Sequence, residues 1–380
     1  MSQALDTARN PVGVDGTLGF WTGLRTVFRM EFMQRMRSRS WYWMMGVWFV
    51  IIGLVTWAVT SSYRSFSDQN VDFQYGQMVF ETVLFFVLLF ALLIAPAFAA
   101  NTISGDRQNG TLAIIQNTLL TPSQIIGGKW LAAWVSALAF LVLSLPFIIW
   151  SFALGGVNFN RVLLFSVMLA FELLVMTGIG VAVSSLSVRP LFSVLGTYLL
   201  VALFAVGTLI GFGLGTQMSL EKVQAHYTEG PAKEPPAEVM YAEDSKVISD
   251  WYEANSKCST DMMETTIAHT ERFTWALAAN PFVMVADIAR EPYRAENNNN
   301  SGFQLFSGIS QGVRIAQAGP EYQVPCLTGK KLSELPDPQV FPIWPLGVGI
   351  QLVFLGALLI GARNRLKTPV QKLASGMRIA

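Results

Sequence analysis

The sequence has few charged residues. Asp, Glu, Lys and Arg make up 13% of its 380 residues, whereas a soluble protein carries about 25%. Hydrophobic residues make up 52%. This composition excludes an ordinary soluble domain and is typical of a membrane protein that crosses the bilayer several times. The formal net charge is only +1, and the basic residues flank apolar segments, so the sequence gives no support for binding nucleic acid.

Residues suited to catalysis or metal binding are also scarce. The two histidines, His226 and His269, have no spacing that suggests a metal site. Lys129 follows a glycine, but the earlier glycine and the following Ser or Thr of a phosphate-binding P-loop are missing. We find no nucleophile motif. We therefore expect no catalytic, cofactor-binding or metal-binding residues, and no ATP hydrolysis by this chain itself.

Cysteine is limited to Cys258 and Cys326, which both fall in a long polar insertion at residues 215–340. If this insertion lies outside the cell, the oxidising environment favours a disulfide between them. Two free thiols are the alternative.

Long apolar segments dominate the rest of the chain. Six of them are about 20 residues long, which is enough to cross a hydrocarbon core of about 30 Å. They cover residues 41–60, 78–100, 130–152, 161–183, 191–214 and 341–362. The sequence therefore predicts an all-α polytopic membrane protein with five transmembrane helices within residues 41–214 and the sixth at 341–362.

The distribution of Lys and Arg predicts the orientation. The N-terminal segment 1–40, the loop 101–129, the turn before Pro190 and the tail 363–380 together hold fourteen basic residues, against two in the short loops on the opposite side. Basic residues favour the cytoplasmic side. We expect a multi-pass protein of the plasma membrane with both termini cytoplasmic and the insertion extracellular.

Residues 18–39 predict a helix with an apolar stripe formed by Trp21, Leu24, Phe28, Phe32 and Met36. Glu31 and Arg35 interrupt the stripe. An amphipathic helix lying in the membrane interface fits this pattern best, and a soluble helix is the alternative.

The loop 101–129 is too polar to span a membrane. Asn109-Gly110 predicts a turn, after which Thr111 is suited to cap a helix over residues 112–120. Leu112, Ile115 and Leu119 share one face of that helix. This face either folds back on the chain's own helices or docks on another protein.

A second helical turn is expected at Thr121-Pro122, with Gln124 completing a capping box. We expect this turn to end at Gly127-Gly128, before the third span.

The pattern from Asp106 to Lys129, D-R-x-x-G-T-L-x5-T-x-x-T-P-S-x4-G-K, resembles the first cytoplasmic loop of ABC-2 type (type V fold) exporter permeases. Asp106 stands where that family usually has Glu, and Ala113 stands where Glu often follows the Leu. The resemblance implies a coupling helix that presses into a separate ATPase subunit. The implied coupling residues are Asp106, Arg107, Gly110, Thr111, Leu112, Ile115, Leu119, Thr121 and Pro122.

The resemblance also implies the assembly: two ATPase subunits, which bind ATP and Mg²⁺, and a second permease that is identical or homologous. In this family paired permeases meet along the first and fifth spans. Gly207, Gly211 and Gly215 recur every four residues in the fifth span and allow close helix approach. We expect them either at that interface or in packing within the chain.

Glu172 lies near the middle of the fourth span. A carboxylate at this depth is costly, so it should face the bundle interior or a cavity. It either contributes to transport, through a substrate contact or a proton-linked switch, or forms an interhelical hydrogen bond.

Within the insertion, helices are expected at residues 243–256, 259–279 and 282–290. The resemblance implies re-entrant helices before the last span, and an ordinary domain core is the alternative.

We interpret the chain as the permease of an ATP-driven exporter of an apolar or amphipathic molecule. The alternatives are a membrane scaffold or sensor acting through its outer domain, and a secondary transporter that uses Glu172, although no inverted repeat is evident.

Overall fold

A computed structural model describes residues 19–66, 75–116, 118, 120–155, 157–241, 245–288, 305–331, 334–336 and 338–367. Within these residues, six helical segments are long and apolar enough to cross a membrane. They are α2 (Arg39–Phe66), α3 (Tyr75–Ala99), α6 (Pro122–Ala153), α7 (Phe159–Leu186), α8 (Pro190–Ala202) continued by α9 (Thr208–Met218), and α15 (Trp344–Leu366). The predicted six spans are confirmed.

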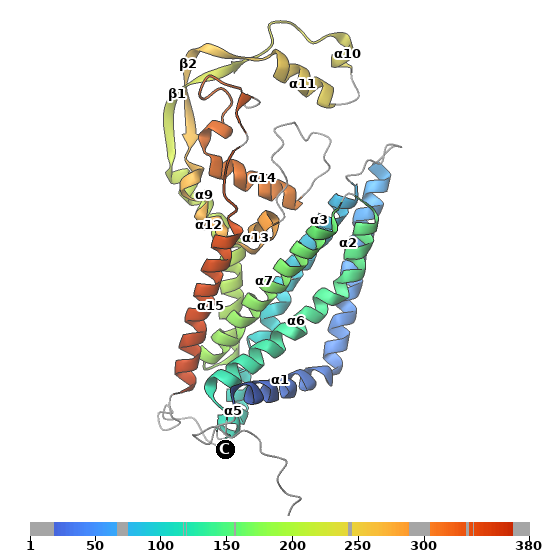
Figure 1. The fold of residues 1–380 in the computed structure, drawn as a ribbon, viewed down its shortest axis with the longest axis vertical. Coiled ribbons are helices and arrows are strands. Elements are labelled where there is room, and N and C mark those ends of the chain that lie inside the picture. The colour runs from blue at the N-terminus through green and yellow to red at the C-terminus, as the bar shows by residue number, and fades with distance from the viewer. Residues whose placement is uncertain are drawn as a thin grey trace, which may run out of the picture.

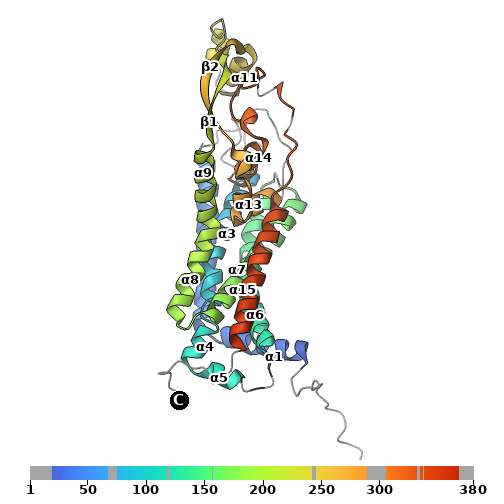
Figure 2. The ribbon, with the colours of Figure 1, turned by 90° about the vertical axis from the view of Figure 1, so that its left-hand side faces the viewer.

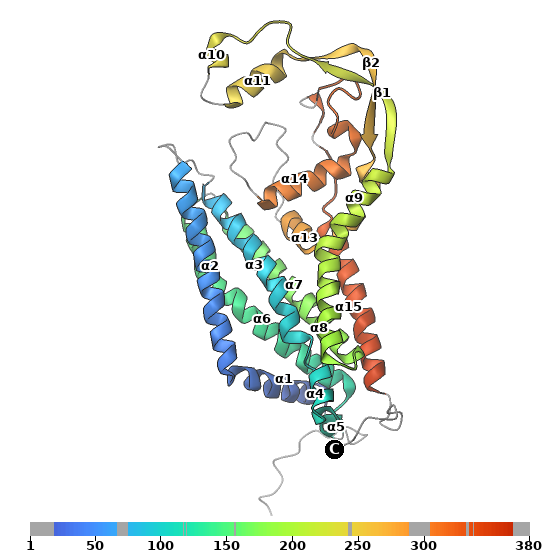
Figure 3. The same ribbon diagram turned by 180° about the vertical axis from the view of Figure 1, so that it is seen from behind.

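The spans are arranged around α3, α6 and α7. In α3 and in α7, more than half of the residues in the most apolar stretch of the helix are buried inside the protein. The corresponding fraction is 17% in α2, 17% in α8–α9 and 22% in α15. Figure 3 shows α2 at one side of the bundle and α8, α9 and α15 at the other. Large apolar side chains on the outer spans are exposed, among them Leu54, Trp57, Leu199, Ile210 and Val353. These surfaces require lipid or another membrane protein to cover them.

A short helix, α1 (Phe20–Met36), lies across one end of the bundle beside α4 (Ser104–Gln108) and α5 (Thr111–Gln116) (Figure 1). The last residues of α15 reach the same end, and the insertion stands at the other. The orientation of α1 across the spans agrees with the predicted interfacial helix.

The third span begins earlier than predicted. The helix α6 runs without a break from Pro122 through Gly127-Gly128, so the expected stop at these glycines was wrong. The absence of side chains at these glycines instead allows α1 to pack closely against α6. A Cβ atom added at Gly128 would lie 2.6 Å from Cβ of Val27, and one added at Gly23 would lie 2.6 Å from the side chain of Gln124.

The fifth span contains one π-helical turn, η1 (Leu203–Gly207). Such a turn disturbs the regular backbone pairing. The side-chain nitrogen of Asn280 donates to the Ala205 carbonyl and to Thr208 Oγ1, both at 2.8 Å, and so joins the insertion to this turn.

The three glycines of the fifth span do not share one role. A Cβ atom at Gly215 would collide with the Phe273 ring at 2.5 Å, so this glycine serves packing within the chain. At Gly207 the close neighbour of an added Cβ atom is Leu203 of the same span, and at Gly211 no atom of the described residues outside the helix's own backbone lies within 4 Å of one. Of the three glycines, Gly211 therefore has the most room for a partner.

The insertion contains a two-stranded antiparallel sheet formed by β1 (Leu220–Glu229) and β2 (Lys257–Ala268) (Figure 2). The helix predicted over residues 259–279 was therefore wrong in its first half. Thr260, Thr265, Thr266 and Ile267 are β-branched and favour a strand, and backbone pairing with β1 from Leu220 to Glu229 stabilises it.

The remaining helices of the insertion agree better with the sequence. The predicted helix at 243–256 is α11 (Ser245–Asn255), and the one at 282–290 is α13 (Pro281–Ile288), preceded by α12 (Trp275–Ala278). The other elements are η2 (Thr270–Arg272), α10 (Ala237–Met240), α14 (Leu305–Ala318) and η3 (Pro320–Tyr322).

Two buried carboxylates fasten the insertion to the spans. Glu81 of α3 accepts hydrogen bonds from the backbone nitrogens of Phe306 and Ser307 at the start of α14, at 2.9 and 3.1 Å. Asp287 of α13 accepts from the backbone nitrogens of Ile343 and Trp344 at the start of α15, at 2.6 and 3.0 Å. Carboxylates stabilise helix N-termini because they accept from unpaired N–H groups and oppose the helix dipole.

A disulfide joins Cys258, at the start of β2, to Cys326, with their Cα atoms 5.4 Å apart, and confirms the predicted pairing. The disulfide connects the end of the two-stranded sheet where β1 ends and β2 begins to the segment that leads to the last span.

We predict that replacing both Cys258 and Cys326 by Ser loosens the insertion and leaves the spans intact. The bond closes a loop of 68 residues, which corresponds to about 4 kcal/mol in the chain-entropy model. Limited proteolysis of the purified protein should cleave the variant faster within residues 215–340 and at an unchanged rate elsewhere. Equal cleavage rates, or labelling of both thiols in the unreduced wild type by an impermeant reagent, would contradict this expectation.

Candidate functional site

The short helices α4 and α5 form an elbow between the second and third spans, which we call the α4–α5 elbow (residues 104–116). Gly110 sits in the turn between them with φ +75°, a conformation that glycine adopts readily, and the predicted turn is confirmed. Thr111 is the first residue of α5, and its hydroxyl donates to the Asp106 carbonyl at 3.2 Å. The helix thus begins at Thr111, one residue before the predicted start, and the Thr111 hydroxyl closes the elbow.

The apolar face of α5 differs from the predicted one. Leu112 is 5% exposed and packs inward with Ile103, the residue before α4, and Ile126 of α6. Ile115 is half-buried, whereas Ile114 is 70% exposed. Leu119 lies outside the described residues. The expectation that Leu112 faces a partner protein was thus wrong, and Ile114 takes the outward position.

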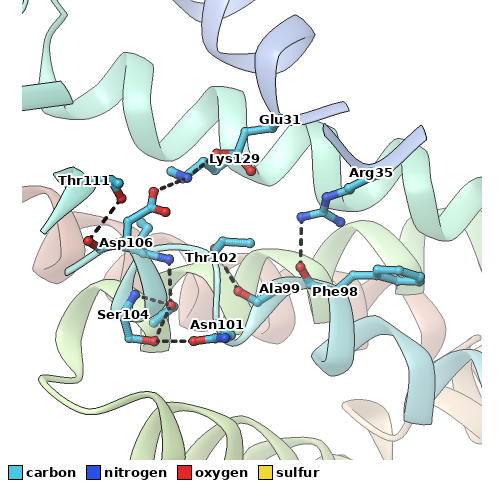
Figure 4. Close-up of polar contacts among 12 residues, drawn as sticks. Glu31, Arg35, Phe98, Ala99, Asn101, Thr102, Ser104, Asp106, Thr111 and Lys129 are labelled. Carbon is cyan, nitrogen blue, oxygen red and sulfur yellow. Dashed lines mark hydrogen bonds and ion pairs between the residues drawn. The ribbon is translucent and has the colours of Figure 1, made fainter. Parts of the chain in front are cut away.

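Lys129 joins the elbow to α1 and α6. Its ammonium group is 1% exposed and forms ion pairs with Glu31 of α1 and with Asp106 of α4, the latter at 2.7 Å (Figure 4). Burying an ammonium group is costly unless opposite charges compensate it. Two carboxylates from two different elements supply that compensation, so the three elements are fixed at one point.

The elbow is also fastened to the end of α7. The Arg107 guanidinium donates to the carbonyls of Ser185, at 3.1 Å, and Ser187. The hydroxyl of Ser184 accepts from the backbone nitrogens of Ile103 and Ser104 at 3.0 and 2.9 Å. Asp106 and Arg107, which the resemblance places among the coupling residues, thus both bind within the chain.

The start of α6 has the predicted capping box. Thr121 accepts from the backbone nitrogen of Gln124, the Gln124 side chain accepts from the Thr121 nitrogen at 2.7 Å, and Pro122 occupies the first turn. Gln124 also donates to the Gly19 carbonyl at 3.2 Å. The residue that caps α6 therefore also holds the beginning of α1.

The face of α1 that packs on α6 contains Gly23, Val27 and Glu31, which lie one turn apart. The two residues that interrupt the apolar stripe are explained by this packing. Glu31 binds Lys129, and Arg35 donates to the Phe98 carbonyl at 2.9 Å while its guanidinium lies 5.6 Å from the Phe98 ring centre. Burial lowers the pKa of the Arg35 guanidinium, and the Glu31 carboxylate raises it.

Glu172 is 1% exposed and faces the last span. The side-chain nitrogen of Gln351 lies 3.3 Å from both carboxylate oxygens and also donates to the Ala279 carbonyl at 3.1 Å. This is the interhelical hydrogen bond that the sequence left open as an alternative. It connects the fourth span, the sixth span and the insertion.

The histidines contact groups within the insertion: His226 the Ser259 carbonyl at 2.8 Å, and His269 the carboxylates of Glu271 and Glu221 at 2.8 and 3.3 Å. Among the described residues, no group of three or more His, Cys, Asp or Glu side chains is arranged to hold a metal ion.

We predict that replacing Lys129 by Met destabilises the protein, because Glu31 is left buried without its counter-charge. Breaking a buried ion pair in this way costs about 3–5 kcal/mol. The measurement is the melting temperature of the purified protein in detergent. The double variant Lys129→Met, Glu31→Gln removes the more deeply buried of the two carboxylates that Lys129 compensates and leaves the more exposed Asp106, so it should melt between the single variant and the wild type. A double variant no more stable than Lys129→Met would show that the buried charge of Glu31 is not the cause.

Comparison with known proteins agrees with this geometry. The family described as ABC-2 family transporter protein matches residues 25–299, which include α1 from Arg25 onward, the α4–α5 elbow and the first five spans. No curated protein and no solved structure matches the chain. The matched stretch is more than half of the sequence. The chain belongs to the ABC-2 family of transporter proteins.

Proposed function

We propose that this protein is the permease of an ATP-driven exporter and that its ATPase binds at the α4–α5 elbow. Family membership makes the chain a permease component of an ABC transporter. The ATP and Mg²⁺ then belong to the ATPase, because this sequence lacks a P-loop. We further propose two ATPase subunits, two permeases and an apolar or amphipathic cargo.

The single observation that supports docking at the elbow is the exposed side chain of Ile114. It is 70% exposed at the end of the bundle, beyond the spans that lipid covers. Its polar neighbours Gln108, Asn109 and Thr111 are exposed as well. An exposed apolar residue within a polar rim is the arrangement that protein interfaces use.

The attachment of the elbow supports a role in transmitting force. An ATPase that docks on Ile114 would exert force on α5, which packs against the rest of the chain through Leu112. From there the force would reach α6 and α1 through the ion pairs of Lys129, and α7 through Arg107. A loosely tethered loop would absorb such a displacement, whereas these bonds would pass it to three helices, α1, α6 and α7.

The orientation that we propose places the elbow, α1 and both termini in the cytoplasm and the disulfide-bonded insertion outside. The fourteen basic residues on one side against two on the other support it. The disulfide supports it independently, because such bonds persist in oxidising compartments.

A second permease is proposed to cover the first and fifth spans. In both, only 17% of the most apolar stretch is buried within the chain. Gly211 offers a close approach on the fifth span, since nothing within the described chain lies near it. Gly215 no longer belongs to this surface, because Phe273 covers it.

We predict that replacing Ile114 by Asp prevents the ATPase from binding. An unpaired charge in a desolvated contact costs several kcal/mol, about 1.4 kcal/mol being tenfold in affinity. The spans should still insert, because the change lies outside them. Co-purification should yield the permease without its ATPase, and transport should stop.

Gln108→Ala is the matched control for Ile114→Asp, because Gln108 is an exposed elbow residue whose loss removes no apolar contact. This variant should retain the ATPase. Wild-type stoichiometry of the ATPase in the Ile114→Asp preparation would rule out the elbow as the docking element.

We also predict that Glu172→Gln reaches the membrane but lowers transport or substrate-stimulated ATPase activity. The amide can still bond to Gln351, so the fold is retained, but the charge or proton at mid-span is lost. Transport and ATPase assays across the usable pH range measure this effect, with Gln351→Leu as the variant that removes the bond itself. Activity of Glu172→Gln equal to wild type at every pH would leave Glu172 only its interhelical bond.

A further inference from the structure

We propose that Arg25 and Arg29 of α1 form a binding surface for the headgroups of anionic phospholipids. The proposal rests on α1 lying along the membrane surface, at the end that we assign above to the cytoplasm. It names a lipid partner that neither family membership nor the proposed docking of an ATPase supplies.

The position of the two arginines on α1 is the first argument. Both are exposed, and they lie one turn apart. Counted from Val27, which faces α6, they lie about 160° and 200° around the helix at 3.6 residues per turn. They therefore point away from the face that packs on α6. The helix α1 lies across the end of the spans (Figure 1), which is where the headgroups of a bilayer that surrounds the spans would lie.

The aromatic residues of α1 identify the side on which the acyl chains lie. Trp21 is 77% exposed, and Phe28 and Phe32 are half-buried. These rings occupy the sector about 100° to 140° from Val27, between the packed face and the arginines. An interfacial helix has this order, with rings at the acyl boundary and cationic groups at the depth of the phosphates.

The charge balance supplies the third argument. Between residues 19 and 62 the sequence has five arginines and one acidic residue. That residue, Glu31, is bound to Lys129, and Arg35 is bound to the Phe98 carbonyl. Within the part of the chain that the structure describes, Arg25 and Arg29 form no ion pair.

A phosphate is the counter-charge that best fits a pair of exposed guanidinium groups, because Arg binds phosphate oxygens through two parallel hydrogen bonds. Arg37 follows the last residue of α1, and Arg39 is the first residue of α2. Arg25 and Arg29 are therefore the exposed arginines of α1 itself, and the lipid surface that we propose is formed by these two.

The test places the purified chain in nanodiscs of phosphatidylglycerol and phosphatidylcholine in equal amounts. Spin-labelled lipids then report how strongly each headgroup associates with the protein. Replacing both arginines by Gln should lower the preference for phosphatidylglycerol, by about fivefold for each arginine if each contributes as a basic residue near an anionic surface does. Raised salt should reduce the wild-type preference in the same direction.

Two control variants separate charge from damage to the fold. Arg25→Lys with Arg29→Lys keeps both charges and should retain most of the preference. Lys233→Gln with Lys257→Gln removes two exposed charges from the insertion and should retain all of it. The melting temperature of each variant should stay at the wild-type value, because the four residues are exposed.

An unchanged preference for phosphatidylglycerol in the Arg25→Gln, Arg29→Gln variant would overturn the proposal. Loss of the ATPase from this variant with an unchanged lipid preference would assign the arginines to the ATPase instead. Because the lipid measurement uses the permease alone in a symmetric bilayer, its outcome does not depend on the docking element or on the orientation of the chain.

Discussion

The buried ammonium group of Lys129 is the constraint on which this end of the molecule depends. A lysine that is 1% exposed requires opposite charge, and the two carboxylates that provide it come from α1 and α4. Glu31 can reach Lys129 only if α1 lies close against α6, and that approach requires the absence of side chains at Gly23 and Gly128. The charged residue that interrupts an amphipathic stripe, the glycine pair in the third span and the acidic residue of the elbow are therefore parts of one arrangement.

This arrangement changes what the elbow can do. An isolated helix of six residues is unstable in water, yet α5 is held because Leu112 is buried and because α4 is bonded to α6 and α7. A partner that binds at Ile114 meets a surface that is already ordered. It loses little conformational entropy on binding, and any movement of the elbow has to displace α1, α6 or α7 with it.

The sequence predicted the features that depend on length and composition. Runs of about 20 apolar residues specify spans, and the cysteines in one compartment specify a bond. The predictions were wrong where contacts with residues far away in the chain determine the local structure. Residues 259–268 form a strand because they pair with β1, which lies well before them in the chain, and Gly127-Gly128 continues a helix because α1 packs there. Leu112 and Ile114 are two residues apart on the six-residue helix α5, so packing against neighbours such as Ile103 and Ile126 determines which of them turns inward.

The second span joins the two ends of the protein. At one end α3 leads into the elbow, where Asp106 binds Lys129. At the other end Glu81 of α3 holds the start of α14 through two backbone nitrogens and the Ser307 hydroxyl, the last at 2.6 Å. A helix transmits displacement along its axis because its backbone bonds resist compression. The 25 residues of α3 correspond to about 37 Å. The elbow and the start of α14 are thus connected through α3, and Asp287 connects the insertion to the start of α15. The insertion is bonded to the spans at several points, among them at Glu81 of α3, through Asp287 at the start of α15 and through Asn280 at the π-helical turn. Separating the insertion from the spans would therefore leave several buried polar groups without their hydrogen-bond partners at once.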